Sequence, residues 1–322
     1  MAITVLWRML HKINVDEVIV AIKATPALNI VAAAAFVIGG YFTLTFYDGF
    51  ALRTIGRRSV PYRIAALAGF TSYSIGHNIG ATVFTGGAVR YRIYSHYGLD
   101  AIEVAKICFV AGLTFWLGNV TVLGIGITIH PTAAGAIDQL GETANRLIGL
   151  GLLTVLGCYL AWVWSAQREV GKGGWTVRLP RGPNTLLQIC IGIIDLSFCA
   201  LAMYMLLPTE PHIDFITLAV IFVTATLLGF ASHSPGGLGV FDAAMLIALY
   251  QFEKEHLLAG LLLFRMLYYL TPFAFALLIL GVREILLNMH GEREKIELAP
   301  VTKVATPILA VEPEKPDASG KL

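Results

Sequence analysis

Two glycine-rich runs, each close to a histidine, are the parts of this sequence whose residues could do chemistry. His77 lies in the first run and His233 precedes the second. Where such a break opens a helix, backbone N–H groups and the positive end of the helix dipole attract phosphate or carboxylate. The glycines expected to bind an anion are Gly86, Gly87, Gly236, Gly237 and Gly239. In the alternative interpretation they only allow close packing of helices.

Two arginines follow the first pair of glycines. Arg90 lies one helical turn before Tyr94, whereas Arg92 faces another side of the same helix. An arginine grips a phosphate through two parallel hydrogen bonds and stays charged. We therefore expect both to bind an anion, and replacement of Arg90 with alanine to stop the activity in a protein that still folds. The alternative is an ordinary arginine at a membrane interface.

Two further charges lie inside long apolar stretches, where an unpaired charge is costly. Asp195 is near the middle of its stretch, and Arg265 is about 12 Å from the nearer end of its own. Their similar depth predicts an Asp195–Arg265 ion pair, which either locks two helices together or belongs to a functional site. Pro272 frees the carbonyl of Tyr268, which predicts a kink beside the arginine.

Three side chains near the breaks are candidates for ion or proton coupling, together with Asp195. Asp242 either balances the dipole of the helix it opens or binds a cation or proton. His77 and His233 either titrate or hydrogen-bond backbone groups that the breaks set free. No cofactor and no metal site is expected, because H-E-x-x-H, G-x-S-x-G, phosphate-loop and zinc-spaced cysteine motifs do not occur.

The composition indicates where these residues must be positioned. Of 322 residues, 57% are apolar and 14% charged, and mean hydropathy is +0.72. Soluble domains carry about 25% charged residues, so a soluble enzyme, a nucleic-acid binder and a disordered scaffold are excluded. The net charge of +2 gives no general attraction to nucleic acid. The sequence therefore predicts an integral membrane protein.

Spanning a membrane takes about 20 mostly apolar residues. The stretches of that length are Ala27–Tyr47, Ile107–Ile129, Leu147–Ala166, Asn184–Leu207 and Leu257–Val282. Two more apolar stretches are broken. Tyr62–Arg92 is interrupted at 76–80 and again at Gly86-Gly87, and Ile213–Tyr250 is interrupted at 232–239. Irregular backbone at membrane depth needs protein or a water-filled cavity around it.

The basic residues indicate how the broken stretches run. If each enters and leaves by the same face, 17 of the 23 Lys and Arg share one side, which the excess of positive charge assigns to the cytoplasm. We therefore expect an all-α polytopic membrane protein with about five full spans and two glycine-rich re-entrant helical hairpins in an inverted repeat. Two short crossings remain an alternative for the second hairpin.

Three regions follow from this topology. Residues 1–26 are expected to form an interfacial helix, or the remainder beside a leading span. Residues 27–282 form the transmembrane domain. Residues 283–322, polar and proline-rich, are expected to be a disordered cytoplasmic tail.

Three motifs together resemble one family. They run from Gly76 to Thr82, from Gly86 to Arg92 and from Ser234 to Asp242. Asp48 and Arg265 also stand at positions similar to those of the family. Over about residues 10–285 the chain resembles the flippase-type transmembrane domain of the bacterial lysylphosphatidylglycerol synthetase/flippase family and its stand-alone membrane relatives.

The resemblance implies a membrane lipid transporter that moves an anionic or aminoacylated phospholipid of the phosphatidylglycerol type, or a related polar lipid, between leaflets. It implies lipid-handling roles for Arg90, Arg92, Asp242 and Arg265. Full-length members carry a soluble aminoacyl transferase domain, whereas about 40 residues follow the last expected span here, so no enzyme activity is expected.

The expected location is the bacterial inner membrane, with the C-terminus in the cytoplasm. The expected partner is a membrane phospholipid and not a nucleic acid. A separate lipid-biosynthetic enzyme and a second copy of the chain are further possible partners. The alternative function is a non-transporting subunit that presents lipid to such an enzyme, in a lysyltransferase or hopanoid pathway.

Overall fold

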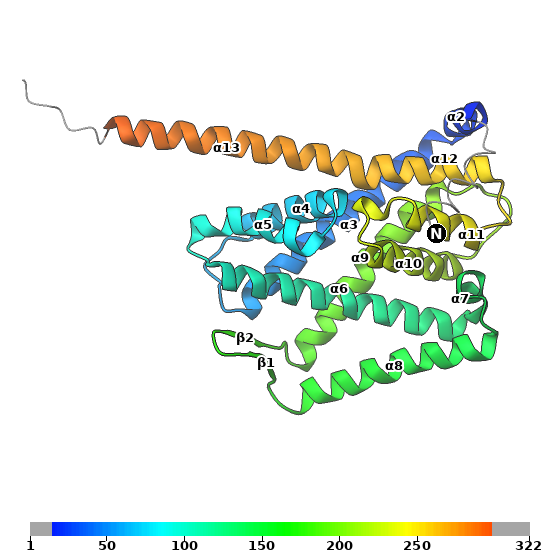
Figure 1. Ribbon diagram of the computed structural model, residues 1–322, viewed down its shortest axis with the longest axis horizontal. Helices are drawn as coiled ribbons and strands as arrows, with labels where there is room; N and C mark the ends of the chain where they lie inside the picture. Colours follow the sequence, from blue (N-terminus) through cyan, green and yellow to red (C-terminus); the bar gives the residue numbers. More distant parts are fainter. Residues whose placement is uncertain (1–14, 298–322) are drawn as a thin grey trace, which may run out of the picture. The chain divides into compact units, whose positions relative to one another are not determined.

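The computed structural model describes residues 15–297, and their regular structure is almost entirely helical (Figure 1). In chain order the helices are α2 (Val15–Ala24), α3 (Ala27–Thr54), α4 (Tyr62–Ile79), α5 (Thr82–Tyr94), the short η1 (Ser95–Tyr97), α6 (Ala101–Ile129), α7 (Pro131–Asp138), α8 (Glu142–Ser165), α9 (Gly182–Leu206), α10 (Phe215–Ala231), the short η2 (Pro235–Gly237), α11 (Val240–Ala248), α12 (Lys254–Phe264), the π-helix η3 (Arg265–Leu270) and α13 (Thr271–Glu297). Between α8 and α9, β1 (Glu169–Lys172) and β2 (Trp175–Arg178) form an antiparallel hairpin.

Five helical segments within residues 15–297 are long and apolar enough to cross a membrane. They are α3, α6, α8, α9 and the continuous α12–η3–α13 from Lys254 to Leu286. Each contains one of the five expected spans to within a residue. The expected fold class, an all-α polytopic membrane protein, is therefore confirmed.

Local sequence signals fix several helix ends. Asp100 and Glu103 form a reciprocal capping box at the start of α6, in which each side chain accepts a hydrogen bond from the other's backbone N–H. Pro131 and Pro183 stand in the first turns of α7 and α9, where the missing proline N–H has no helical partner to lose. Helix α4 ends at Gly80 with a φ of +85°.

The first broken stretch has one interruption, not two. Helices α4 and α5 are separated only at Gly80 and Ala81, and Gly86-Gly87 lies inside α5, so the expected second break is wrong. Packing explains the glycine there, because a Cβ on Gly86 would lie 3.2 Å from the carbonyl oxygen of Ser72 on α4. The second stretch breaks between α10 and α11, as expected.

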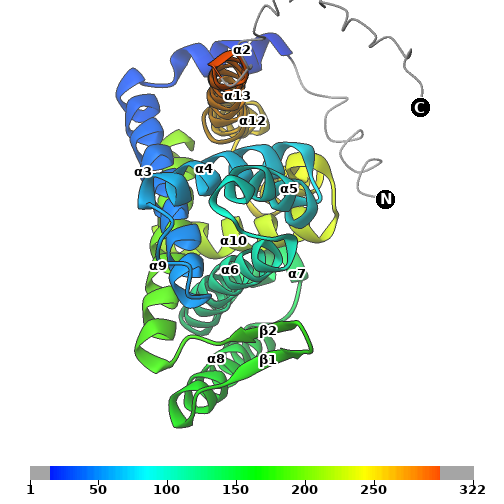
Figure 2. The same cartoon turned by 90° about the vertical axis from the view of Figure 1, so that its left-hand side faces the viewer.

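The long helices cross at small residues. Helices α3 and α9 lie side by side (Figure 2), and α6 crosses α9 where Gly118 meets Gly192. A Cβ on Gly118 would lie 2.7 Å from the Cα of Gly192, so the two backbones are in direct contact. In Figure 1 the helix pairs α4–α5 and α10–α11 lie on opposite sides of the two neighbouring helices α3 and α9.

The ends of the chain depart in part from expectation. Of the region 1–26, residues 15–24 form α2, and residues 1–14 lie outside the described residues. The expectation of disorder over 283–322 is wrong for residues 283–297, which continue α13 as helix. Within the described residues, 281–297 belong to a separate unit, and residues 298–322 lie outside the described residues.

Candidate functional site

The two helix breaks lie against each other although about 155 residues separate them in the chain. The end of α4 contacts η2, and a Cβ on Gly80 would lie 3.3 Å from the Cα of Pro235. A Cβ on Gly236 would lie 3.6 Å from the carbonyl oxygen of His77. Gly80 and Gly236 have φ of +85° and +59°, a region that favours glycine. The tips of the two helix pairs are therefore in direct contact, with Gly80 buried and Pro235 exposed.

One Arg–Asp pair ties α5 to α3. The Arg90 Nε donates to both Asp48 oxygens (3.1 and 3.0 Å), and its Nη2 donates to Oδ1 (2.7 Å). The two side chains are only 5% and 0% exposed. Tyr94 donates its hydroxyl to Asp48 Oδ2 at 2.8 Å, and the Tyr73 ring lies 4.9 Å from the guanidinium. The predicted anion ligand Arg90 is thus already neutralised and enclosed.

A second Arg–Asp pair ties η3 to α11. The Arg265 Nη2 and Nε donate to Asp242 at 2.6 and 3.1 Å, and Nη1 donates to the carbonyl of Gly236 at 3.2 Å. Asp242 also accepts from the N–H of Gly239, so it caps its own helix as one interpretation expected. These side chains are 14% and 15% exposed. The expected Asp195–Arg265 pair is wrong, because the chain folds Asp242 onto the arginine instead.

Asp195 is buried, and no cationic side chain within residues 15–297 forms an ion pair with it. Its Oδ2 accepts a hydrogen bond from the Tyr47 hydroxyl at 3.0 Å. Its Oδ1 has no hydrogen-bond partner among residues 15–297, although the residue is only 4% exposed. Burying a carboxylate with one hydrogen bond is costly when it is ionised. Among residues 15–297 the buried Asp195 carboxyl is therefore held by a single side-chain hydrogen bond, from Tyr47.

The backbone of the second tip is not free to bind an anion. The N–H groups of Gly237 and Leu238 donate to carbonyls within the same loop, and the N–H of Gly239 donates to Asp242. These three amides are already satisfied, contrary to the expectation that an unwound tip offers bare N–H groups. Gly86 and Gly87 lie in the interior of α5, not at a helix start.

The two histidines differ sharply in environment. The half-buried ring of His77 packs among Tyr73, Tyr268 and Tyr269, with ring centroids 5.6, 6.2 and 6.4 Å away. Because Tyr73 contacts Arg90 and Tyr269 lies 5.6 Å from the Arg265 guanidinium, the His77 ring stands between the two ion pairs. His233 is exposed, and its Nδ1 lies 2.8 Å from the carbonyl oxygen of Ala231. Arg92 is also exposed.

The segment before Pro272, where a kink was predicted, takes the form of the π-helix η3 within a continuous helical segment. Two of its carbonyls accept side-chain hydrogen bonds from other helices. Tyr41 of α3 donates to Tyr268 at 3.0 Å, and Asn78 of α4 donates to Tyr269 at 3.0 Å. The irregularity therefore anchors α3 and the first tip to the helix that carries Arg265.

Sequence reasoning missed several of these partners. Asp48 was matched to a family position but not to Arg90, although an acid at the end of an apolar span and an arginine within another apolar stretch are a signal for pairing. Apart from lying near the first break, Asn78 and Tyr73 show no sequence feature that would predict their contacts with Tyr269 and Arg90. Among residues 15–297 no group of three potential metal ligands occurs.

The fold and the site define a polytopic, all-α membrane protein in which one buried and one partly exposed Arg–Asp pair flank the contact of two helix breaks. No family model matches the sequence. Over 288 residues the chain is 30% identical to the "Uncharacterized protein slr0712" of Synechocystis, and the match covers 89% of each protein. The chain belongs to the family of that cyanobacterial protein.

Two further relatives extend the comparison. The "Inner membrane protein YbhN" of Escherichia coli is 28% identical over 276 residues, which cover 83% of this chain and 84% of that protein. The "Phosphatidylglycerol lysyltransferase" of Staphylococcus aureus is 24% identical over 279 residues, which cover 85% of this chain but only 32% of that enzyme. The chain is thus a membrane protein related to about a third of a lipid-modifying enzyme, which supports the resemblance noted from the motifs.

Proposed function

We propose that this protein moves a phospholipid with an anionic or aminoacylated headgroup of the phosphatidylglycerol type, or a related polar lipid, between the leaflets of the bacterial inner membrane. The observation that carries the proposal is the meeting of two helix breaks beside the partly exposed Arg265–Asp242 pair. Similarity to phosphatidylglycerol lysyltransferase supports a phospholipid as the ligand.

In this proposal the two helix pairs are re-entrant hairpins that enter from opposite faces as an inverted repeat. Because the tips of the two hairpins meet, a headgroup that moves along one hairpin from its leaflet arrives at the tip of the other hairpin, which leads to the opposite leaflet. Inverted repeats with broken helices that meet at a central site are a recurring transporter architecture. The C-terminus then lies in the cytoplasm, on the side with most of the basic residues.

Arg265 and Asp242 are the groups best placed to receive a headgroup. A phosphate can replace the carboxylate on the guanidinium, while the released Asp242 pairs with an ammonium group of an aminoacylated lipid. Arg90, Arg92, Gly86 and Gly87 within α5, and Gly236, Gly237 and Gly239 of the second tip, complete the proposed path. Movement coupled to an ion or proton would use Asp195 or Asp242, with His77 and His233 as further candidates.

Transport is tested with purified protein in vesicles. Fluorescent phosphatidylglycerol is distributed over both leaflets, and a membrane-impermeant reductant bleaches the outer leaflet. Active protein lets bleaching proceed to the inner pool. We expect Arg265→Gln to abolish bleaching of the inner-leaflet lipid. Arg265→Lys should restore part of that bleaching, because lysine keeps the charge without the bidentate fork. The matched control is Arg178→Gln, which removes an arginine from an exposed ion pair of the β-hairpin.

The rival function, presentation of lipid to a separate enzyme, is favoured by one observation: the related lysyltransferase is about three times as long as the matched segment. Its prediction differs, because a presenting subunit leaves the inner pool unbleached in every vesicle. Wild-type protein that binds phosphatidylglycerol but leaves that pool intact would refute transport and favour the rival.

The hairpin topology has its own test. In a chain without native cysteines, single cysteines at Arg58, Tyr97 and Lys172 should all react with an impermeant thiol reagent from one side of the membrane. A cysteine at Gln139, beyond the α6 span, should react only from the other side. Opposite labelling of Arg58 and Tyr97 would mean that α4 and α5 make a crossing and would remove the first hairpin.

A further inference from the structure

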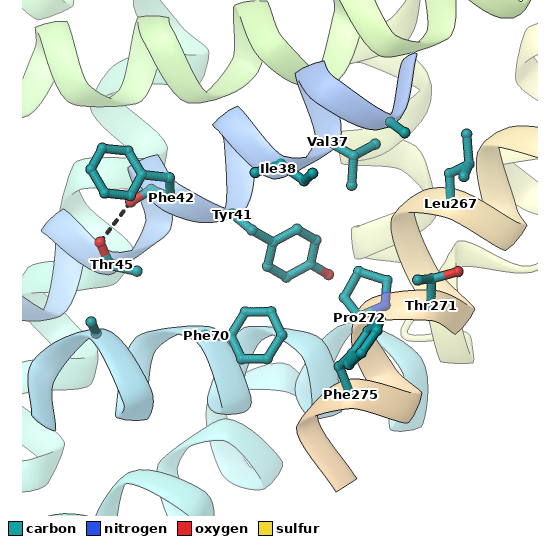
Figure 3. A pocket seen from close by; sticks show the side chains of 12 residues that line it. Val37, Ile38, Tyr41, Phe42, Thr45, Phe70, Leu267, Thr271, Pro272 and Phe275 are labelled. Atoms are coloured by element: carbon teal, nitrogen blue, oxygen red, sulfur yellow. Dashed lines mark hydrogen bonds between the residues drawn. The ribbon is translucent and has the colours of Figure 1, made fainter. Parts of the chain in front are cut away.

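An apolar groove of about 480 Å³ lies between α3, α4 and the η3–α13 segment (Figure 3). Tyr41 of α3 and Phe70 of α4 form its floor, with ring centroids 5.5 Å apart. Leu267 of η3 and Phe275 of α13 form the facing wall. None of these residues belongs to the ion pairs, and the proposed headgroup path leaves the groove unused.

The hydroxyl groups that line the groove are already hydrogen-bonded to backbone carbonyls. The Tyr41 hydroxyl donates to the carbonyl of Tyr268 at 3.0 Å. The Thr45 hydroxyl bonds the carbonyl of Phe42 at 2.6 Å, and that of Thr271 donates to Met266 at 2.8 Å. With these hydroxyls engaged, the groove offers little to water or to a headgroup, and it suits a hydrocarbon ligand.

The position and length of the groove fit one acyl chain. Along α3 its lining runs from Ala34 to Thr45, which is about 16 Å at 1.5 Å per residue. The hydrocarbon core of one leaflet is about 15 Å thick. Ile38, Phe42 and Phe275 at its rim are 70%, 59% and 55% exposed. Since α3 and α13 belong to membrane-length segments, this rim faces bilayer hydrocarbon.

We propose that this groove binds one acyl chain of a membrane phospholipid and so holds the lipid beside the π-helix that carries Arg265. Leu267 lines the groove and follows Arg265 by two residues on the same π-helix, so the groove and the ion pair lie on different sides of that helix. The link between the groove and transport rests on the proposed function, whereas binding of the acyl chain does not.

The test uses the full chain in lipid nanodiscs that contain phosphatidylglycerol with a photoactivatable diazirine in one acyl chain. After illumination, mass spectrometry locates the labelled residues. We expect labelling concentrated on the groove residues of α3, α4 and α13. Ala34→Trp fills the groove and should lower that labelling several-fold. Ala35→Trp, one position on and facing outward, is the matched control and should leave it unchanged.

Two results would overturn the acyl-chain site. One is equal labelling of wild type and Ala34→Trp, or labelling spread evenly over all exposed faces of the spans. The other is a covalent dimer formed through Ile38→Cys, which would place a second copy of the chain in the groove. Groove labelling in a protein that does not move lipid would refute the proposed function alone. Transport without groove labelling would refute the tail site alone.

Discussion

Removing one partner of the Asp48–Arg90 pair should destabilise the protein more than removing both. Arg90→Met leaves a fully buried carboxylate that keeps only the hydroxyl of Tyr94, and Asp48→Leu leaves a buried guanidinium. Breaking a buried pair in this way costs about 3–5 kcal/mol, whereas an apolar pair of similar volume is often neutral. We therefore expect the double variant to be more stable than either single variant.

The free energy of unfolding of all four proteins can be measured in mixed micelles by titration with a denaturing detergent. The matched control is the cycle Arg178→Met and Glu169→Leu, whose side chains are 77% and 51% exposed. An exposed pair contributes about 0–1 kcal/mol, so its single variants should differ little from wild type. Additive losses at Asp48 and Arg90 would refute the reasoning, because independent sites do not interact.

The double variant also separates two roles of Arg90. The enclosed pair predicts that Arg90→Ala loses stability as well as activity, so that variant alone does not identify a headgroup ligand as the sequence suggested. If the stable double variant moves lipid, Arg90 only holds α5 to α3. If it is stable and inactive, Arg90 belongs to the path.

Three further outcomes are expected. Asp195→Asn keeps an acceptor for the hydrogen bond from Tyr47, so the variant should fold normally. Its lipid movement in vesicles should no longer depend on pH. An unchanged pH profile would exclude Asp195 as the proton site. Gly118→Ala forces a Cβ to within 2.7 Å of Gly192 and should lower the free energy of unfolding by about 1–3 kcal/mol. Gly112→Ala on the same helix meets nothing within 4 Å and should be neutral or slightly stabilising. Equal effects of the two variants would contradict the close crossing of α6 and α9. Asp100→Ala removes the capping box of α6 and should cost about 1 kcal/mol by the same titration, and no loss would mean that membrane packing alone sets that helix end.

The spans were predictable because bilayer thickness dictates their length. An apolar run such as Ala27–Tyr47 has one stable arrangement in hydrocarbon, a helix with its backbone bonded internally. The second break was equally visible, since Pro235 lacks an N–H for the helical hydrogen bonds and the glycines after it disfavour helix. The first break was predicted to extend to Gly86 and Gly87, which are helical in the structure. Gly86 packs against Ser72 of α4 and Gly87 against Cys108 of α6, and local helix propensity does not report such tertiary contacts.

The partners of the buried charges were not predictable from depth. Asp195 and Arg265 lie at similar distances along their helices, but depth along an axis does not say which way a side chain faces. The fold of the second break sets Asp242 against Arg265 and leaves Asp195 with Tyr47. The β1–β2 hairpin was also missed, because its basic residues were interpreted only as a topology signal.

The π-helix η3 determines how α13 is rotated about its axis relative to α12. A π-helix inserts one residue into the regular hydrogen-bond ladder, and each residue corresponds to about 100° of rotation about the axis. Deleting one residue from Arg265–Leu270 would therefore turn Pro272 and Phe275 away from Phe70 while Phe264, before the insertion, keeps its neighbours. A single inserted residue thus sets the rotational register between the arginine and the hydrocarbon-lined wall that follows it.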